Sequence, residues 1–354
     1  MFFCIKREQN HIIFEIFKLR FKFKENDKLK AIYKRFWANK YEYIIKSNTL
    51  EKSFEIMYSN NNHKDIYSFF ESKYGSQKAN DLMLKEYIRK VPLLVKEEMV
   101  KLEAKDIDQP SDYVWTMWLQ ENPPQIVQAC LNSIKRIYPN LIIITEANIK
   151  NYIEIPEYIK MRLDKKEMSC AHFSDWVRSV LLDNYGGLWL DATLLLTQPI
   201  PDDLKNSSFN ILRAKRGGIS NWLIKSNKNN YLIKSLRIYL EEYWKNEDFH
   251  FNYFMFHQFF VRYVKQDETA KKIYENTKFF DNKPAFMMCN QSFRNGYGHL
   301  GEDYEEEYYS KVKESYFVQK LTYKDKAAAS NPNSYYWHIV NEYVKDEEIQ
   351  HAKS

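Results

Sequence analysis

A carboxylate and a guanidinium lie three residues apart in the segment 171–178, as Asp175 and Arg178. Residues with this spacing share one face of a helix. Held side by side, they could divide the hydroxyls of a sugar between an acceptor and donors, and the cation could also meet a phosphate. The alternative is an intrahelical ion pair worth only a few tenths of a kcal/mol. The pair alone therefore does not identify a site.

A second carboxylate, Asp191, follows the short apolar run 188–190, which comes directly after Gly186 and Gly187. Glycine readily takes the left-handed conformation that closes a helix. We therefore expect a helix over 171–184, a turn at the glycine pair and a strand that ends at Asp191. Ligands of open α/β sheets bind beyond the carboxyl ends of the strands, so the three features together predict a ligand site.

The elements around this site alternate between strand and helix. The run 113–119 predicts a strand, the apolar stripe over 124–138 a helix, and 141–145 a second strand. A strand, a helix and a strand at this spacing form a βαβ unit with a parallel sheet. Weaker signals follow, namely strands at 209–214 and 222–224, helices at 231–244 and 252–265, and an acidic, tyrosine-rich surface segment at 302–309.

The N-terminal part has a helical pattern. Apolar residues from Leu29 to Ile45 recur at the spacing of an amphipathic helix, and similar runs occur at 82–88 and, after Pro92 in a first-turn position, at 94–102. We expect a helical region over 1–105, a linker near 105–111, and an α/β domain over 111–345.

Charge and cysteine content exclude several classes of protein. The formal net charge is +6, but the basic excess lies in the first 50 residues, so the α/β domain is close to neutral and we expect no nucleic acid partner. The alternative, an RNA-binding N-terminus, would keep its affinity for RNA in residues 1–105 alone.

Four separated cysteines form neither a disulfide framework nor a zinc pattern. With no apolar run of the roughly 20 residues that span a bilayer, we expect a cytoplasmic protein.

Residues 1–25 mix phenylalanine and isoleucine with lysine and arginine. Such a mixture favours peripheral contact with an anionic membrane surface. The alternative is a helix packed on the α/β domain.

The block Ser174-Asp175-x-x-Arg178, followed by the glycine pair and Asp191-Ala192-Thr193, resembles the capsular polysaccharide synthesis glycosyltransferases. These are relatives of the mannosyltransferases with a DxD signature and the GT-A fold. The segments 114–120, 123–127 and 130–134 are similar to the family's opening strand and helix, and 320–324 is similar to its C-terminal K-L-T/S-x-K segment. The resemblance covers 113–324; its central block is specific, whereas the other pieces are weak alone.

The resemblance implies a GT-A fold, a Rossmann-like α/β fold with a mostly parallel sheet and flanking helices. The implied activity is that of a bacterial enzyme moving a hexose from a nucleotide diphosphate sugar to a capsular or cell-surface saccharide, with retention at the anomeric carbon. A lipid-linked acceptor would make membrane contact useful. The alternative is a non-catalytic nucleotide-sugar or saccharide binding protein on the same fold.

The resemblance also assigns roles to residues. Asp175 and Arg178 would contact the donor sugar, and Asp191 would hold the diphosphate and its Mg²⁺ or Mn²⁺. Trp115 would lie near the base, and His338 would supply a late metal ligand. The expected substrate-binding set also includes Gly187, Thr193 and Lys320.

Thr193 stands where many relatives keep a second aspartate, and divalent cations prefer carboxylate oxygens, so this departure bears directly on metal dependence. The other assignments have alternatives. Trp115 could pack in the core, and His257 could be a hydrogen-bonded core or groove histidine rather than a catalytic base. Lys320 and Lys324 could close over the diphosphate, or be ordinary solvated lysines.

Overall fold

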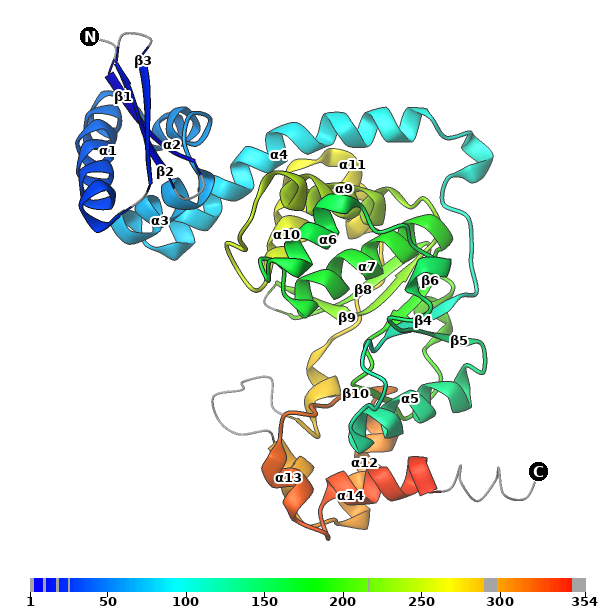
Figure 1. Cartoon of the computed structure of the whole chain (residues 1–354). Helices are drawn as coiled ribbons and strands as arrows, with labels where there is room; N and C mark the ends of the chain where they lie inside the picture. The colour runs from blue at the N-terminus through cyan, green and yellow to red at the C-terminus, as the bar shows by residue number, and fades with distance from the viewer. Residues whose placement is uncertain are drawn as a thin grey trace. The chain divides into compact units, whose positions relative to one another are not determined.

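The computed structural model describes residues 3–8, 11–16, 19–24, 26–215, 217–289 and 298–345; within these ranges, the side chains of 3–8, 11–16, 19–23, 30, 33–40 and 345 are left out. Contacts divide the chain into two units (Figure 1). The first comprises Met1–Arg89 with Asn246–Tyr253, and the second comprises Lys90–Lys245 with Phe254–Ser354. The membrane contact expected from residues 1–25 depends on side chains outside the described set, and it stays a prediction.

The first unit begins with an antiparallel sheet, not with the helix that we expected there. The strands β1 (Phe3–Glu8), β2 (His11–Ile16) and β3 (Leu19–Lys24) pair in chain order. The sequence gives the reason, because 19–24 alternates apolar and basic residues with the two-residue period of a strand. The helical prediction for this segment was wrong.

From Asp27 onward the helical prediction is confirmed. The helices are α1 (Asp27–Ser47), α2 (Leu50–Tyr58), α3 (His63–Tyr74) and α4 (Ser76–Val100). Pro92 lies inside α4 and not in a first turn, so one helix replaces the two that we expected. The division between the units falls within α4, at Arg89, whereas the expected linker 105–111 lies in the second unit.

The segment 246–253 belongs to the first unit through a buried carboxylate. Glu247 accepts hydrogen bonds from the hydroxyls of Tyr58 and Tyr87, and its Oε1 lies 3.1 Å from His63 Nδ1. Only 1% of the Glu247 residue is exposed. A buried charge is tolerated only with such partners, so this carboxylate holds the segment against α2, α3 and α4.

The second unit is built on a five-stranded mixed sheet with the order β5-β4-β6-β9-β8. Its strands are β4 (Val114–Met117), β5 (Leu141–Ile144), β6 (Gly187–Leu190), β8 (Phe209–Arg213) and β9 (Ile219–Ser226). β4 is parallel to β5 and β6, and β9 is antiparallel to both β6 and β8. The predicted βαβ unit and the mixed α/β class with flanking helices are therefore confirmed.

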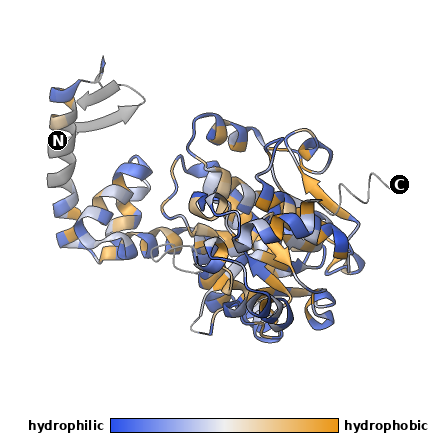
Figure 2. Cartoon of the chain, turned by 90° about the horizontal axis from the view of Figure 1, so that it is seen from below, coloured by the Kyte–Doolittle hydropathy of each residue, from blue (hydrophilic) through white to orange (hydrophobic). Residues whose placement is uncertain are grey.

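A two-stranded sheet of β7 (Leu194–Leu196) and β10 (Val318–Lys320) follows the carboxyl end of β6. Figure 2 shows strands of the second unit largely in the colour of apolar residues. The helices are α5 (Gln125–Ile137), α6 (Glu157–Asp164), α7 (Cys170–Tyr185), α8 (Asp202–Lys205), α9 (Tyr231–Asn246), α10 (Met255–Gln266), α11 (Glu268–Glu275), α12 (Glu306–Ser315), α13 (Lys326–Ser330) and α14 (Tyr335–Val340).

An apolar cluster ties β10 to the main sheet, because Val318 packs in the same cluster as Leu190 of β6 and Leu194 of β7. Tyr309, in the segment that we expected at the surface, is fully buried in a second cluster with α5 and α14. Of the helices that the structure describes, none combines the length and the apolar character needed to cross a bilayer.

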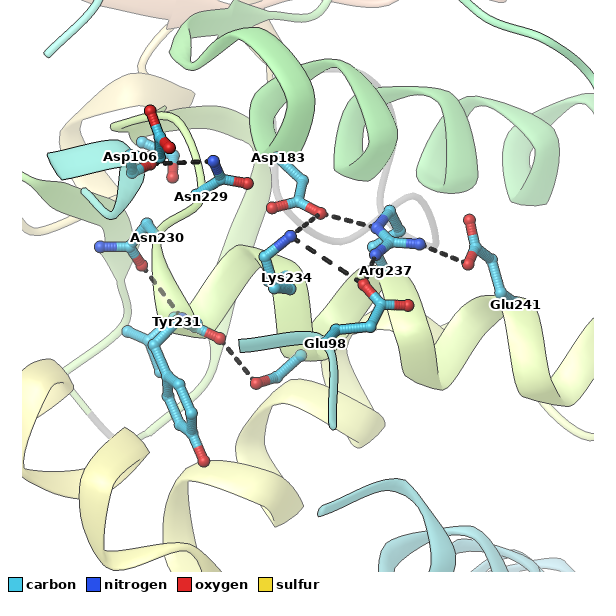
Figure 3. A network of polar contacts seen from close by, with 12 residues as sticks. Glu98, Asp106, Asp183, Asn229, Asn230, Tyr231, Lys234, Arg237 and Glu241 are labelled. Atoms are coloured by element: carbon cyan, nitrogen blue, oxygen red, sulfur yellow. Dashed lines mark hydrogen bonds and ion pairs between the residues drawn. The ribbon is translucent and has the colours of Figure 1, made fainter. Parts of the chain in front are cut away.

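A buried ion network joins α4, α7 and α9 within the second unit (Figure 3). Asp183 of α7 is fully buried, and its Oδ2 lies 3.0 Å from Lys234 Nζ and 2.7 Å from Arg237 Nε. Glu98 and Glu241 pair with the same Arg237 guanidinium. The network fixes α7, the helix that carries Asp175 and Arg178, against its neighbours.

Replacing Asp183 by asparagine should lower the free energy of unfolding by about 3 kcal/mol, because it leaves two buried cations short of negative charge. Denaturant unfolding of Asp183→Asn measures the loss. Glu157→Gln is the matched control, since the Glu157 side chain is 89% exposed and should change stability by no more than about 0.5 kcal/mol. Equal stabilities of the two variants would contradict the structural role.

Candidate functional site

The glycine pair between α7 and β6 sets where β6 begins. Gly186 (φ +69°) ends α7, and Gly187 (φ +103°) starts β6 in a conformation that side chains rarely adopt. A Cβ on Gly187 would lie 2.2 Å from the carbonyl oxygen of Tyr113. The close approach of the chain before β4 therefore requires glycine at position 187. The part of Gly187 in substrate binding, which we expected from the sequence, stays a prediction.

Asp175 and Arg178 lie on the buried side of α7, with 6% and 4% of each residue exposed. From the spacing of the apolar residues, we expected these two side chains on a different face of the helix from the apolar stripe. In the structure α7 is buried on most of its faces, so both side chains are buried as well. The Arg178 Nη2 atom lies 3.5 Å from Asp175 Oδ1, and Asn221 Nδ2 donates to the same oxygen at 2.7 Å. The expected pairing of the two residues is present in the structure.

The Arg178 guanidinium is surrounded by acceptors. Its Nε donates to the Ser174 carbonyl at 3.1 Å, its Nη2 donates to Ser174 Oγ at 2.9 Å, and its Nη1 donates to the carbonyl of Asn221. The Nη1 atom also lies 3.3 Å from Asp191 Oδ1, and the cation sits 4.9 Å from the centre of the Trp189 ring. Arg178 is therefore placed to hold two carboxylates in position.

Asp191 lies at the carboxyl end of β6, as the sequence predicted. Its Oδ1 accepts a hydrogen bond from Trp189 Nε1 at 2.9 Å and faces Arg178. Its Oδ2 lies 3.0 Å from Lys320 Nζ. The Asp191 side chain is 23% exposed and that of Lys320 is 22% exposed, so solvent reaches both groups.

Lys320 and Thr193 meet beside this carboxylate, 2.5 Å apart between Nζ and Oγ1. Lys320 ends β10, and Leu321 N donates to the Thr193 carbonyl at 2.9 Å. The structure thus brings Lys320 to the site, whereas Lys324 is exposed, with its ammonium 5.9 Å from the centre of the Tyr323 ring.

The two carboxyls differ in pKa. Burial raises the pKa of Asp175 to about 7, although the Arg178 cation opposes the rise. Burial acts on Asp191 in the same direction, but Lys320 and Arg178 outweigh it and hold the pKa of Asp191 at about 2. At neutral pH, Asp191 is a carboxylate, while Asp175 is divided between its neutral and ionised forms.

His257 of α10 lies close enough to this cluster for its pKa to respond to it. Burial lowers the pKa of His257 to about 4, Arg178 lowers it further, and Asp191 counteracts. Its buried Nδ1 has no hydrogen-bond partner among the described residues. A neutral imidazole with an unpartnered ring nitrogen can bind a hydroxyl, and the role of His257 stays a prediction.

The structure does not bring Trp115 or His338 to the cluster. Trp115 is fully buried, stacks on Tyr113 and donates from Nε1 to the Gly186 carbonyl at 2.9 Å, which is the core packing that we weighed as its alternative. His338 stacks on Tyr304 with ring centres 3.6 Å apart, and its Nε2 lies 3.9 Å from Glu342 Oε2.

The donor set at Asp191 does not fit a resident divalent cation. Such ions need several oxygen ligands, usually including carboxylates, but both Asp191 oxygens and the Thr193 hydroxyl already face nitrogen donors or cations. Within the part of the chain that the structure describes, no three His, Cys, Asp or Glu side chains gather as a metal site. The expected roles of Asp191 and His338 as metal ligands stay predictions without a matching geometry.

Asn221 and Trp189 are site residues that the sequence did not single out. Asn221 lies in β9, whose antiparallel pairing with β6 brings it to Asp175. No local motif marks it, because the pairing joins segments about thirty residues apart in the chain. Trp189 lies inside the motif block, and its position two residues before Asp191 was the available signal.

A comparison with curated proteins gives no match to this chain. A family described as capsular polysaccharide synthesis protein matches residues 64–339. This match contains the whole stretch 113–324 over which the motifs showed a resemblance, including α7, β6 and Lys320. Because it covers well over half of the sequence, the chain belongs to the capsular polysaccharide synthesis protein family.

Proposed function

We propose that the protein is a glycosyltransferase of the GT-A type, which moves a hexose from a nucleotide diphosphate sugar to a capsular or cell-surface saccharide with retention. One observation carries the proposal. The D-x-x-R pair of α7, the strand-end Asp191 and Lys320 of β10 form one connected cluster beyond the carboxyl end of β6, where ligands of α/β sheets bind.

The exposed members of the cluster suit a diphosphate. Lys320 presents a positive charge that solvent reaches, and Arg178 adds a second charge behind Asp191. Preorganised cations stabilise the charge that develops on a departing diphosphate, and this is commonly the largest contribution to such catalysis. Arg178, whose donors already face protein acceptors, would act here by its charge and by positioning Asp175 and Asp191.

Asp175 and His257 supply groups for sugar hydroxyls. The ionised form of Asp175 accepts hydrogen bonds and its neutral form donates one, while His257 Nδ1 lacks a partner among the described residues. In the proposed reaction, the bond from the anomeric carbon to the diphosphate oxygen breaks and a bond to the acceptor oxygen forms on the same face. The acceptor proton passes to the leaving diphosphate. The protein contributes orientation and electrostatic stabilisation.

The partners remain part of the proposal. The acceptor is a growing saccharide, including one carried on a lipid, and residues 1–25 would then contact the inner face of the membrane from a cytoplasmic location. The second candidate, a non-catalytic binding protein on the same fold, rests on Thr193 in place of an aspartate. It predicts binding of nucleotide sugars without turnover.

Purified protein, incubated with a panel of nucleotide diphosphate sugars, should slowly release nucleoside diphosphate from one of them. Asp175→Asn should lower this rate by on the order of 100-fold, because the amide cannot ionise and so offers no carboxylate to the sugar hydroxyl. The matched control is Asp164→Asn, an exposed carboxyl at the end of α6, which should keep the wild-type rate. Release of nucleoside diphosphate from none of the sugars, despite their binding, would favour the non-catalytic alternative.

The stability of the protein should depend on the ionisation of Asp175. Its pKa of about 7 lies above the ordinary value of 3.8, so the folded state holds a proton that the unfolded chain loses, and stability from this group falls as pH rises from about 4 to about 7. Asparagine does not titrate. The melting temperature of Asp175→Asn relative to wild type should therefore be higher at about pH 8 than at about pH 5, whereas an unchanged difference would show that Asp175 is already ionised at the lower pH.

A further inference from the structure

Asp191 and Thr193 direct their side-chain oxygens at one point, and that point is occupied by the Lys320 ammonium. The Nζ atom lies 3.0 Å from Asp191 Oδ2 and 2.5 Å from Thr193 Oγ1. From the sequence we expected Asp191 and His338 to be metal ligands, with Thr193 in the place of a second aspartate. In the structure, Asp191 and Thr193 hold a side-chain cation.

The backbone fixes Lys320 at this position. β10 pairs antiparallel to β7 with Lys320 opposite Leu194, and the next residue, Leu321, donates its N–H to the Thr193 carbonyl at 2.9 Å. Val318 of β10 is fully buried in the apolar cluster that also contains Leu190 of β6. The lysine stem therefore begins from an ordered strand next to Thr193, and the ammonium is not that of a freely moving surface lysine.

Electrostatics disfavours a divalent cation at the same place. Arg178 Nη1 lies 3.3 Å from one Asp191 oxygen, and Lys320 Nζ lies 3.0 Å from the other. A metal ion bound to this carboxylate would therefore lie close to two positive charges. Unit charges of the same sign repel strongly at such distances when water is partly excluded. The other carboxyl of the cluster, Asp175, is turned to Asn221 and Arg178.

Lys320 keeps capacity for a ligand. An ammonium has three N–H donors, and Asp191 and Thr193 account for two of them. The side chain is 22% exposed, so the remaining donor is reachable from solvent. Lysine binds phosphate as a point charge, which matches the charge that a metal ion would otherwise supply to a diphosphate.

We propose that the Lys320 ammonium, held by Asp191 and Thr193, takes the place of a divalent cation in this protein and binds the diphosphate of the donor directly. Binding of the donor then needs no metal ion. The inference rests on the proposed function, because it assumes that the donor is a nucleotide diphosphate sugar.

Calorimetric titration with UDP, GDP, ADP and CDP, each in chelator and in Mg²⁺ or Mn²⁺, tests the inference on the full chain. At least one nucleoside diphosphate should bind in chelator, with an affinity within about threefold of that measured with metal. The reason is that the contact between the Lys320 ammonium and the diphosphate replaces the contact that a metal ion would make. Lys320→Met should weaken binding in chelator by about 10- to 100-fold, the range for loss of a hydrogen bond to a charged group.

Lys326→Met is the matched control. Lys326 is an exposed lysine of α13, and its replacement removes the same net charge. Because the proposed contact is local, and the net charge of the protein contributes little, the affinity of this variant should stay within about twofold of wild type. Melting temperatures of both variants show that they are folded. Lys320→Arg, which keeps the charge, should retain more affinity than Lys320→Met.

Three results would overturn the inference, and they are distinguishable. Binding of a nucleoside diphosphate only when Mg²⁺ or Mn²⁺ is present would show that a metal ion holds the diphosphate, and the proposed glycosyl transfer would still stand. Absence of binding in every buffer would remove the donor class and with it the proposed function. Undiminished binding by folded Lys320→Met in chelator would assign the diphosphate to another part of the protein.

Discussion

The sharing of one carboxylate by two cations governs the geometry of this site. Asp191 is held by Arg178 of α7 on one oxygen and by Lys320 of β10 on the other. Removing either partner would leave a charge uncompensated in a partly buried site, and this would destabilise the site. The ends of α7, β6 and β10 are thereby fixed relative to one another, although they lie far apart in the sequence.

This pairing depends in turn on where β6 begins and ends. The absence of a side chain at Gly187 lets β6 approach the backbone at Tyr113, just before β4. Four residues later, β6 ends and Asp191 follows at the carboxyl edge of the sheet. The ion network around Asp183 fixes the other side of α7. Gly187 and Asp183, which lie outside the cluster of Asp175, Arg178, Asp191 and Lys320, therefore determine where that cluster lies.

The periodic elements were predictable because each carries its signal locally. The βαβ unit, α7 and the strand that ends at Asp191 follow from apolar spacing and from the glycine pair. The N-terminal strands were missed because the apolar residues at 12–14 are contiguous, whereas only 19–24 alternates clearly between apolar and basic residues. The two-residue period of a strand was therefore not recognised. The burial of Trp115 was one of two interpretations that the residue type allowed, and it became visible only in the tertiary packing; the expected place of Trp115 near the base stays a prediction.

The composition of the charged cluster was less predictable, for a physical reason. Lys320 reaches Asp191 through the pairing of β10 with β7, and Asn221 reaches Asp175 through the pairing of β9 with β6. Register between distant strands is set by the packing of their apolar faces, which no local motif reports. A resemblance at Asp191-Ala192-Thr193 thus suggested a metal, whereas the geometry supplies a lysine.

A crystal structure of the protein with a nucleotide diphosphate sugar, grown in chelator, is the most direct test of this account. It should show a diphosphate oxygen at about 2.7–2.9 Å from Lys320 Nζ, with the hexose toward Asp175 and His257. A diphosphate that makes no contact with Lys320, or a donor that binds only in crystals grown with Mg²⁺ or Mn²⁺ and through a metal ion on Asp191, would contradict the role of the lysine. A donor bound elsewhere on the protein would contradict the assignment of the site.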